Sequence, residues 1–287
     1  MPRHRAAVFR SLGLLDLKRR LAPPAIASVL ALALGAAWSA HAMHLGALKH
    51  AISGAEAAHP NALWHIVHDL CDRDARLSGD PAPCAKVDLK AGYALIKDVE
   101  RPSQFLLLPT VRVTGIESPA LLSPRSPNYW RAAWANRDRV ARQLGRPVPR
   151  EDIGLAVNSY GGRTQNQLHI HIDCVSPEAR QLLSGKLTSL GPRWSALTVG
   201  PRDIRYRARW IDGADPGPAD PFKILARTDP RARADMGRMS LALIPAIRPD
   251  GAQGFVLLAD RSDDEHDAAA EELLDHHCRV LSGPGGV

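Results

Sequence analysis

Aromatic residues are scarce in this chain of 287 residues, at 5% of the sequence, and acidic side chains are outnumbered by basic ones. The low aromatic content argues against a protein that binds single-stranded nucleic acid, because such proteins stack bases on aromatic rings. The hydrophobic content of 45% and charged content of 23% exclude a disordered chain, a collagen-like chain and a polytopic membrane protein. The length suffices for one large or two small domains with a sizeable core.

The basic excess of +7 is concentrated at the N-terminus. Residues 1–42 carry six Arg or Lys side chains and the single acid Asp16. The rest of the chain is therefore close to neutral, which gives no electrostatic reason to expect nucleic acid as a partner.

An apolar segment follows these basic residues. Residues 21–48 contain no Asp, Glu, Lys or Arg, and Ala40-His41-Ala42 has the small-x-small form of a signal-peptidase site. The pattern predicts a signal peptide or an outward membrane anchor over residues 1–42, since Lys and Arg before an apolar segment stay in the cytoplasm. We expect a linker over 43–58 and one domain over 59–287. That domain would lie in the periplasm, anchored to the inner membrane or free if the leader is cleaved.

Cysteine usage supports export. The four cysteines are Cys71, Cys84, Cys174 and Cys278, and none forms a C-x-x-C pair of the zinc-binding or thioredoxin type. In an oxidising compartment such an even set is expected to form disulfides, for which three pairings are possible. The polar loop 72–83 closes easily, which favours Cys71–Cys84 together with Cys174–Cys278.

Periodicity predicts an α+β fold with an antiparallel sheet, because strand pairs precede helices without regular βαβ alternation. We expect helices over 59–70, 127–144, 177–183 and 268–281, and strands over 92–97, 104–108, 153–157, 168–175, 205–210, 222–226, 239–244 and 254–258. The strand–turn–strand regions 92–108 and 239–258 suggest a degenerate duplication.

The most informative segment runs from Arg163 to Asp173. Strand side chains alternate between faces, so Gln167, His169, His171 and Asp173 are predicted to share one side. The glycine-containing loop 158–164 precedes them and carries Arg163. Backbone N–H groups and a guanidinium beside histidines suit a phosphate group.

Two reactions suit alternating histidines. A neutral imidazole can attack phosphorus and form a phosphohistidine that water then cleaves. Alternatively, His169, His171 and Asp173 chelate Zn²⁺ in a zinc-dependent phosphodiesterase. The familiar metallohydrolase pattern has a further histidine after the aspartate, where this chain has Cys174. A third hypothesis is a periplasmic protein that binds a nucleotide or lipid without turnover. The adjacent His276 and His277 are expected to be solvated at a helix end.

These residues carry a resemblance. The run QLHIHIDC resembles the histidine-triad signature, and the region ALIKD to PSQFLLLP is similar to the first hairpin of that superfamily. Together with LLLPTVRVTGIESP, AVNSYGGRTQN, the loop between Cys71 and Cys84 and the exported N-terminus, they resemble the bacterial CDP-diacylglycerol pyrophosphatase family. The resemblance covers roughly residues 60 to 280.

The resemblance implies that the middle triad histidine, His169, is the nucleophile and that His171 contacts phosphate oxygens. The first triad position is Gln167, which departs from the signature. A shifted register, with His169 first, His171 as nucleophile and Asp173 third, stays open.

The remaining candidate residues follow from the same comparison. Asn158 and Thr164 match loop positions that bind phosphate, and Asn166 takes the place of Thr164 in the shifted register. Asp98 matches the aspartate that binds ribose hydroxyls. Arg163 is added for its charge, and Lys97 is a weaker candidate.

The implied reaction is hydrolysis of the pyrophosphate bond of CDP-diacylglycerol to CMP and phosphatidate. No cofactor or metal is required, because cationic and N–H donors meet the developing charge. The implied partners are the lipid-nucleotide substrate and the membrane, and a homodimer is compatible with the sequence.

Overall fold

The computed structural model describes residues 59–199 and 204–282. The leader and linker predicted for residues 1–58 lie outside these ranges. Within the described part of the chain, no helix combines the length and the apolar character needed to span a bilayer.

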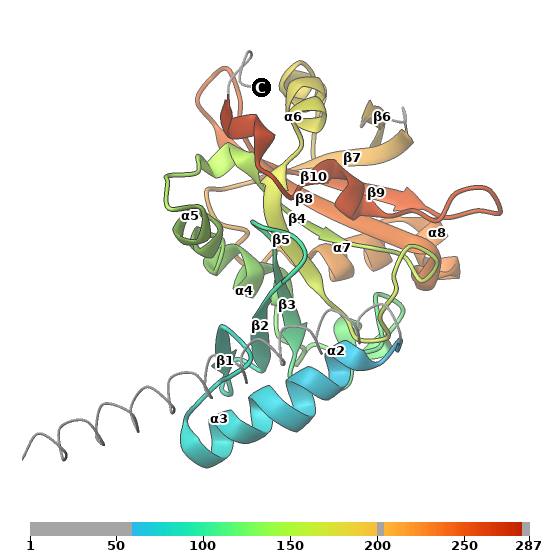
Figure 1. The fold of residues 1–287 in the computed structure, drawn as a ribbon. Helices are drawn as coiled ribbons and strands as arrows, with labels where there is room; N and C mark the ends of the chain where they lie inside the picture. Colours follow the sequence, from blue (N-terminus) through green and yellow to red (C-terminus); the bar gives the residue numbers. More distant parts are fainter. Residues whose placement is uncertain (1–58, 200–203, 283–287) are drawn as a thin grey trace, which may run out of the picture. The chain divides into compact units, whose positions relative to one another are not determined.

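One antiparallel sheet organises the described residues, and the expected α+β fold is confirmed (Figure 1). Its main path runs in the order β1-β2-β3-β5-β4-β8-β9-β7-β6, and β10 pairs with β5. The strands are β1 (Lys86–Asp88), β2 (Tyr93–Lys97), β3 (Phe105–Pro109), β4 (Ile153–Val157), β5 (Ile170–Val175), β6 (Ser195–Val199), β7 (Ile204–Asp212), β8 (Met239–Ile247), β9 (Gln253–Arg261) and β10 (Leu274–Asp275).

The sheet contains two halves with the same connectivity. The first half has the order β2-β3-β5-β4 and the second, read from the opposite edge, has the order β6-β7-β9-β8. The halves meet where Leu155 of β4 pairs with Leu243 of β8. The duplication hypothesis paired the wrong regions, since the topological counterpart of β8 and β9 is β4 and β5, not the first hairpin.

Helices α4 (Tyr129–Ala135), α5 (Asp138–Leu144), α7 (Pro221–Thr228) and α8 (Pro230–Ala234) contribute to an apolar core on one face of the sheet. Trp130 packs edge-on against Phe222, and Trp134 packs edge-on against Phe255. Alternate residues of β5, including Ile170 and Ile172, belong to this core.

Two separate apolar clusters lie on the other face. A continuous helical segment, formed by α2 (Ala62–His65), the π-helical η1 (Ile66–Asp72) and α3 (Arg73–Ser78), covers β2 and β3 through its first two parts. Helix α6 (Pro177–Ser184) packs with residues of β4, β8, β9 and β7. Strand β5 lies between β3 and β4; its Val175 joins the second cluster, and its His171 and Asp173 belong to neither cluster.

One row of paired residues across the sheet shows which side chains lie between the two apolar clusters. On this face, Leu106 of β3 pairs with His171 of β5, and His171 pairs with Ala156 of β4. In the second half, Leu258 of β9 occupies the position that corresponds to His171. The histidine face is thus built once, in the first half of a nearly symmetric sheet.

Three expected elements differ from the structure. The helix expected over 127–144 is interrupted between α4 and α5, where the Asn136 amide donates to Tyr93 and to the carbonyl oxygen of Ala132. The strand expected over 222–226 is helix α7, because Pro221 starts it and the Asp220 side chain caps the N–H of Phe222.

The helix expected over 268–281 is the third difference. This region consists of the 3₁₀ turns η6 (Ala270–Leu273) and η7 (Arg279–Ser282) with β10 between them. Strand β10 pairs with β5, and Cys278 is bonded to Cys174 of the same strand. Pairing and the disulfide override the helical periodicity of the sequence.

Both disulfides favoured by the sequence are present, Cys71–Cys84 and Cys174–Cys278. The first closes a separation of 13 residues after η1, and the second closes a separation of 104 residues. The longer bridge fixes the segment after β10 to the strand that carries the histidines.

The two bridges predict different losses of stability. Because a cross-link restricts the unfolded chain more when it closes a longer loop, Cys174→Ala/Cys278→Ala should lose about 4–5 kcal/mol of unfolding free energy. The matched variant Cys71→Ala/Cys84→Ala should lose about 3 kcal/mol. Urea unfolding under oxidising conditions measures both, and an equal or reversed order would contradict this account.

Candidate active site

His169 is held in one tautomer by the backbone. It precedes β5, is 8% exposed, and its Nδ1 lies 2.8 Å from the carbonyl oxygen of Gln167. A carbonyl oxygen only accepts, so Nδ1 must carry the proton. The other ring nitrogen, Nε2, therefore keeps its lone pair.

Gln167 forms the support for this arrangement. Its side chain is fully buried, and its Nε2 donates to the carbonyl oxygens of Pro109 and Val111, each at 3.0 Å. Its Oε1 accepts from the N–H of Val113 at 3.3 Å. Gln167 thus ties the start of the histidine segment to the end of β3 and the chain that follows it.

His171 follows on the same face, with its ring 4.9 Å from that of His169 in an edge-on arrangement. Its Nδ1 lies 3.0 Å from Oε2 of Glu271, but neither atom has a hydrogen-bond partner of good geometry within the described residues. Its Nε2 is also buried without a partner there. A buried ring whose Nε2 has no partner there is suited to a polar group that arrives from outside.

Both histidines are neutral at physiological pH. Burial lowers the pKa of His169 to about 4, and His171 and Arg163 act in the same direction. Burial lowers the pKa of His171 to about 3, with Arg101 and His276 adding to the effect. The neutral form is the one in which an imidazole can act as a nucleophile.

Asp173 lies next along this face and joins two distant segments. Its Oδ1 accepts from the hydroxyl of Ser103 at 2.5 Å and from the N–H of Cys174 at 2.8 Å. Its Oδ2 lies 2.7 Å from Nδ1 of His276. This fully buried carboxylate therefore connects the loop before β3 to the segment after β10.

The glycine loop approaches His169 from the other direction. A cavity of about 10 Å³ lies among Gly115, Asn158, Arg163 and His169, about enough for one water molecule. Asn158 donates to the carbonyl oxygen of Gly162 and accepts from the N–H of Glu271, both at 3.1 Å. It thereby holds η6, which carries Glu271, against the loop.

Arg163 is paired rather than free. Its two terminal nitrogens donate to the carboxylate of Glu117 at 2.6 and 2.8 Å, while its Nε is buried with no partner among the described residues. Thr164 is exposed on the loop, and Asn166 accepts a long bond of 3.4 Å from Arg163. The charge of this guanidinium is largely compensated by Glu117.

Asp98 serves the turn in which it lies. Its carboxylate accepts from the N–H groups of Glu100 and Arg101, at 2.9 and 3.2 Å, and from the side chain of Gln104 at 2.8 Å. This turn brings Arg101 toward Glu271, 3.8 Å away, and close enough to His171 to lower its pKa.

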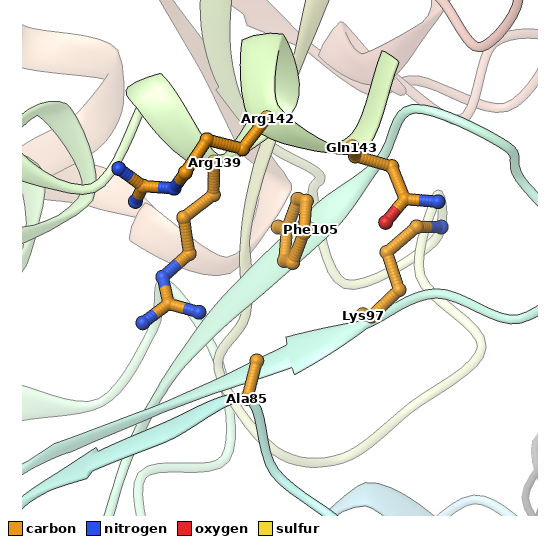
Figure 2. A pocket seen from close by; sticks show the side chains of 6 residues that line it. All are labelled: Ala85, Lys97, Phe105, Arg139, Arg142 and Gln143. Carbon is orange, nitrogen blue, oxygen red and sulfur yellow. The ribbon is translucent and has the colours of Figure 1, made fainter. Parts of the chain in front are cut away.

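Lys97 faces the opposite side of the sheet. It lines a pocket of about 280 Å³ with Phe105 and with Arg139 and Arg142 of α5, and none of the lining residues belongs to the histidine face (Figure 2). Its Nζ donates to the carbonyl oxygen of Arg101 at 2.7 Å and also to that of Asp98. Lys97 therefore stabilises the turn between Asp98 and Arg101 from the face opposite the histidines.

The zinc hypothesis requires His169, His171 and Asp173 to converge. Among the described residues, the cluster whose ligand atoms lie within metal-binding distance is Asp173 with Cys174 and Cys278. The two cysteines are bonded to each other, so they offer no thiolate. The two histidines do not join this cluster.

The structure adds four residues that the sequence interpretation did not select: Arg101, Ser103, Glu271 and His276. Arg101 and Ser103 lie in the turn that follows Asp98. Their closeness in sequence to Asp98, a predicted ribose-binding residue, was the only feature that could have pointed to them. His276 was expected to be solvated because the region was predicted to be a helix. Only the pairing of β10 with β5 reveals its position beside Asp173.

The lowered histidine pKa values predict a specific pH dependence of stability. The unfolded state binds protons with a pKa near 6.5, so it gains protons before the folded state does as the pH falls. Stability should therefore drop by about 2 kcal/mol for each ring between pH 7 and pH 5. In the double variant His169→Asn/His171→Asn, the unfolding free energy measured in urea should fall less over this pH range than in the wild type, by about 2 kcal/mol for each ring removed.

The exposed His277 provides the control for this experiment. His277→Asn should keep the full pH dependence of the wild type. If the double variant kept it as well, the two rings would not be buried in their neutral form.

Comparison with known sequences shows the family of this chain. Residues 58–282 match the family described as CDP-diacylglycerol pyrophosphatase. A CDP-diacylglycerol pyrophosphatase from Yersinia pestis is 41% identical over 223 residues, which cover 77% of this chain and 85% of that protein. The family match includes the whole site, from Asp98 to His276. The chain therefore belongs to the CDP-diacylglycerol pyrophosphatase family.

Proposed function

We propose that this enzyme hydrolyses the pyrophosphate bond of CDP-diacylglycerol in two displacements at the phosphorus that bears cytidine, with His169 as the nucleophile. Membership of the family supplies the substrate and the overall reaction. In the first displacement, Nε2 of His169 bonds to phosphorus and phosphatidate leaves. In the second, water bonds to phosphorus, the P–N bond breaks and CMP is released.

The observation that carries this proposal is the hydrogen bond between Nδ1 of His169 and the carbonyl oxygen of Gln167. It leaves the lone pair on Nε2, and the lowered pKa keeps that nitrogen unprotonated. Because Nδ1 retains its proton, the phosphorylated ring is an imidazolium, which is a good leaving group for the second displacement. Among the described residues, Nδ1 of His171 has instead a contact of poor hydrogen-bond geometry with Glu271, and this contrast supports His169 over the shifted register.

Charge on the phosphate oxygens is met from two sides in this proposal. His171 offers Nε2, which has no partner among the described residues. Arg101 is the charged group with the largest effect on the pKa of His171. Arg163 and Asn158 line the small cavity beside His169. Thr164 is exposed on the loop, and in this proposal its hydroxyl binds the phosphate when the substrate enters. These donors act on the charge that develops in the transition state.

Two predicted ligands receive other roles in the proposal. Gln167 is assigned to positioning, because its amide is occupied by backbone groups of the chain after β3. Asp98 is assigned first to the turn that presents Arg101. A ribose contact would have to use lone pairs that these bonds leave free.

Outward attachment to the inner membrane is part of the proposal. The substrate is a phospholipid and stays in a bilayer, and the basic residues followed by an apolar segment in residues 1–42 are typical of an exported chain. The two disulfides agree with an oxidising compartment.

The nucleophile can be tested by trapping the intermediate. Substrate labelled at the cytidine-bearing phosphorus is mixed with enzyme and quenched in denaturing alkali, in which a P–N bond survives. The wild type should retain one label per active chain, and His169→Ala should retain none. Turnover of His169→Ala should fall by roughly 10⁴-fold or more.

Two controls accompany the trapping. The exposed His68 provides a matched variant, His68→Ala, which should behave as the wild type. Label kept by His169→Ala but lost in His171→Ala would move the nucleophile to His171. Loss of turnover in EDTA with recovery in Zn²⁺, and no trapped label, would favour the zinc phosphodiesterase.

A further inference from the structure

His276 has features that the two displacements by His169 leave unused. Its Nδ1 lies 2.7 Å from Oδ2 of Asp173, a carboxylate that is completely buried. Its side chain is 29% exposed, whereas that of His171 is 3% exposed. A buried acceptor therefore orients a ring that is itself partly exposed.

The tautomer of His276 follows from the same reasoning as for His169. A carboxylate accepts hydrogen bonds, so Nδ1 carries the proton and Nε2 is the nitrogen that can exchange one. An imidazole oriented in this way by a buried aspartate is a recurrent arrangement for general acid–base catalysis.

The segment that carries His276 is held rigidly. The carbonyl oxygen of His276 lies 2.6 Å from the Ser103 hydroxyl and also accepts the backbone N–H of Ser103 at 3.3 Å. Two residues later, Cys278 is bonded to Cys174 of β5. Such immobilisation keeps a catalytic group in place without cost at each turnover.

His276 lies at the Asp173 end of the row that begins with His169. The rings of His169 and His171 are 4.9 Å apart, Asp173 follows His171 on the same face of β5, and His276 is hydrogen-bonded to Asp173 and lowers the pKa of His171. In an in-line displacement the leaving oxygen departs on the side of phosphorus opposite to the attacking nitrogen. Water enters the second displacement from that same side.

We propose that His276, oriented by Asp173, is the acid–base residue of this reaction, an inference that rests on the proposed function of His169. In the first displacement, Nε2–H of His276 gives its proton to the phosphatidate oxygen as the P–O bond breaks. In the second displacement, the neutral Nε2 takes a proton from water. The water oxygen bonds to phosphorus, and the P–N bond returns its electron pair to Nε2 of His169.

The second displacement should depend on His276 more strongly than the first. Phosphatidate is a stable leaving group that needs little help from an acid, whereas water is a weak nucleophile that needs a base. His276→Ala should therefore form the trapped intermediate and phosphatidate in an initial burst but release CMP slowly. We expect turnover to fall roughly 100-fold and the trapped label to accumulate.

The experiment compares His276→Ala and His276→Gln with His277→Ala, the matched control on the adjacent exposed residue. Rapid alkaline quench measures the trapped label, and separate assays follow phosphatidate and CMP. Added imidazole should accelerate release of CMP by His276→Ala and have no effect on His277→Ala. Thermal unfolding and a thiol assay establish that each variant is folded with both disulfides formed.

The outcomes separate this inference from the proposal on which it rests. If folded His276 variants lost the burst and turnover together, with no accumulated label and no response to imidazole, His276 would be a structural residue only. Turnover within about threefold of the wild type would also overturn the inference. If neither the wild type nor any variant gave a trapped label, the covalent role of His169 would fail first.

Discussion

One hydrogen bond, from Nδ1 of His169 to the carbonyl oxygen of Gln167, decides which nitrogen of this ring keeps its lone pair. It is effective because the ring is buried, so that the neutral form dominates and Nε2 keeps its lone pair. The bond in turn depends on Gln167, whose amide is tied to the backbone after β3. Gln167 thereby supports the histidine that we propose as the nucleophile.

The sheet explains why a polar face survives in the middle of the fold. Its two halves share one strand order, and each face needs apolar cover. On the histidine side, the N-terminal helical segment covers β2 and β3 and helix α6 covers the second half, which leaves His171 and Asp173 of β5 between the two clusters. The turn with Arg101 and the segment with Glu271 and His276 close around that gap. A single site in a nearly symmetric sheet is the consequence.

The strongly periodic parts of this chain were predictable from sequence, and the irregular parts were not. Strand β4 was predicted with the observed bounds. The alternation predicted from residue 168 begins only at Ile170, but the rings of His169 and His171 lie close together as expected. The region 268–281 was predicted wrongly, since its apolar spacing resembles a helix while strand pairing and a disulfide determine its path. The position of His276 was therefore hidden, because no local pattern encodes a contact between residues 103 positions apart.

The stereochemical course of the reaction tests the central claim most directly. The substrate carries sulfur on the cytidine-bearing phosphorus in one configuration and is hydrolysed in water labelled with heavy oxygen. Two successive in-line displacements each invert phosphorus, so the account predicts CMP phosphorothioate with retained configuration and with the heavy oxygen in CMP. Inverted configuration, or heavy oxygen found in phosphatidate, would contradict a covalent intermediate on His169.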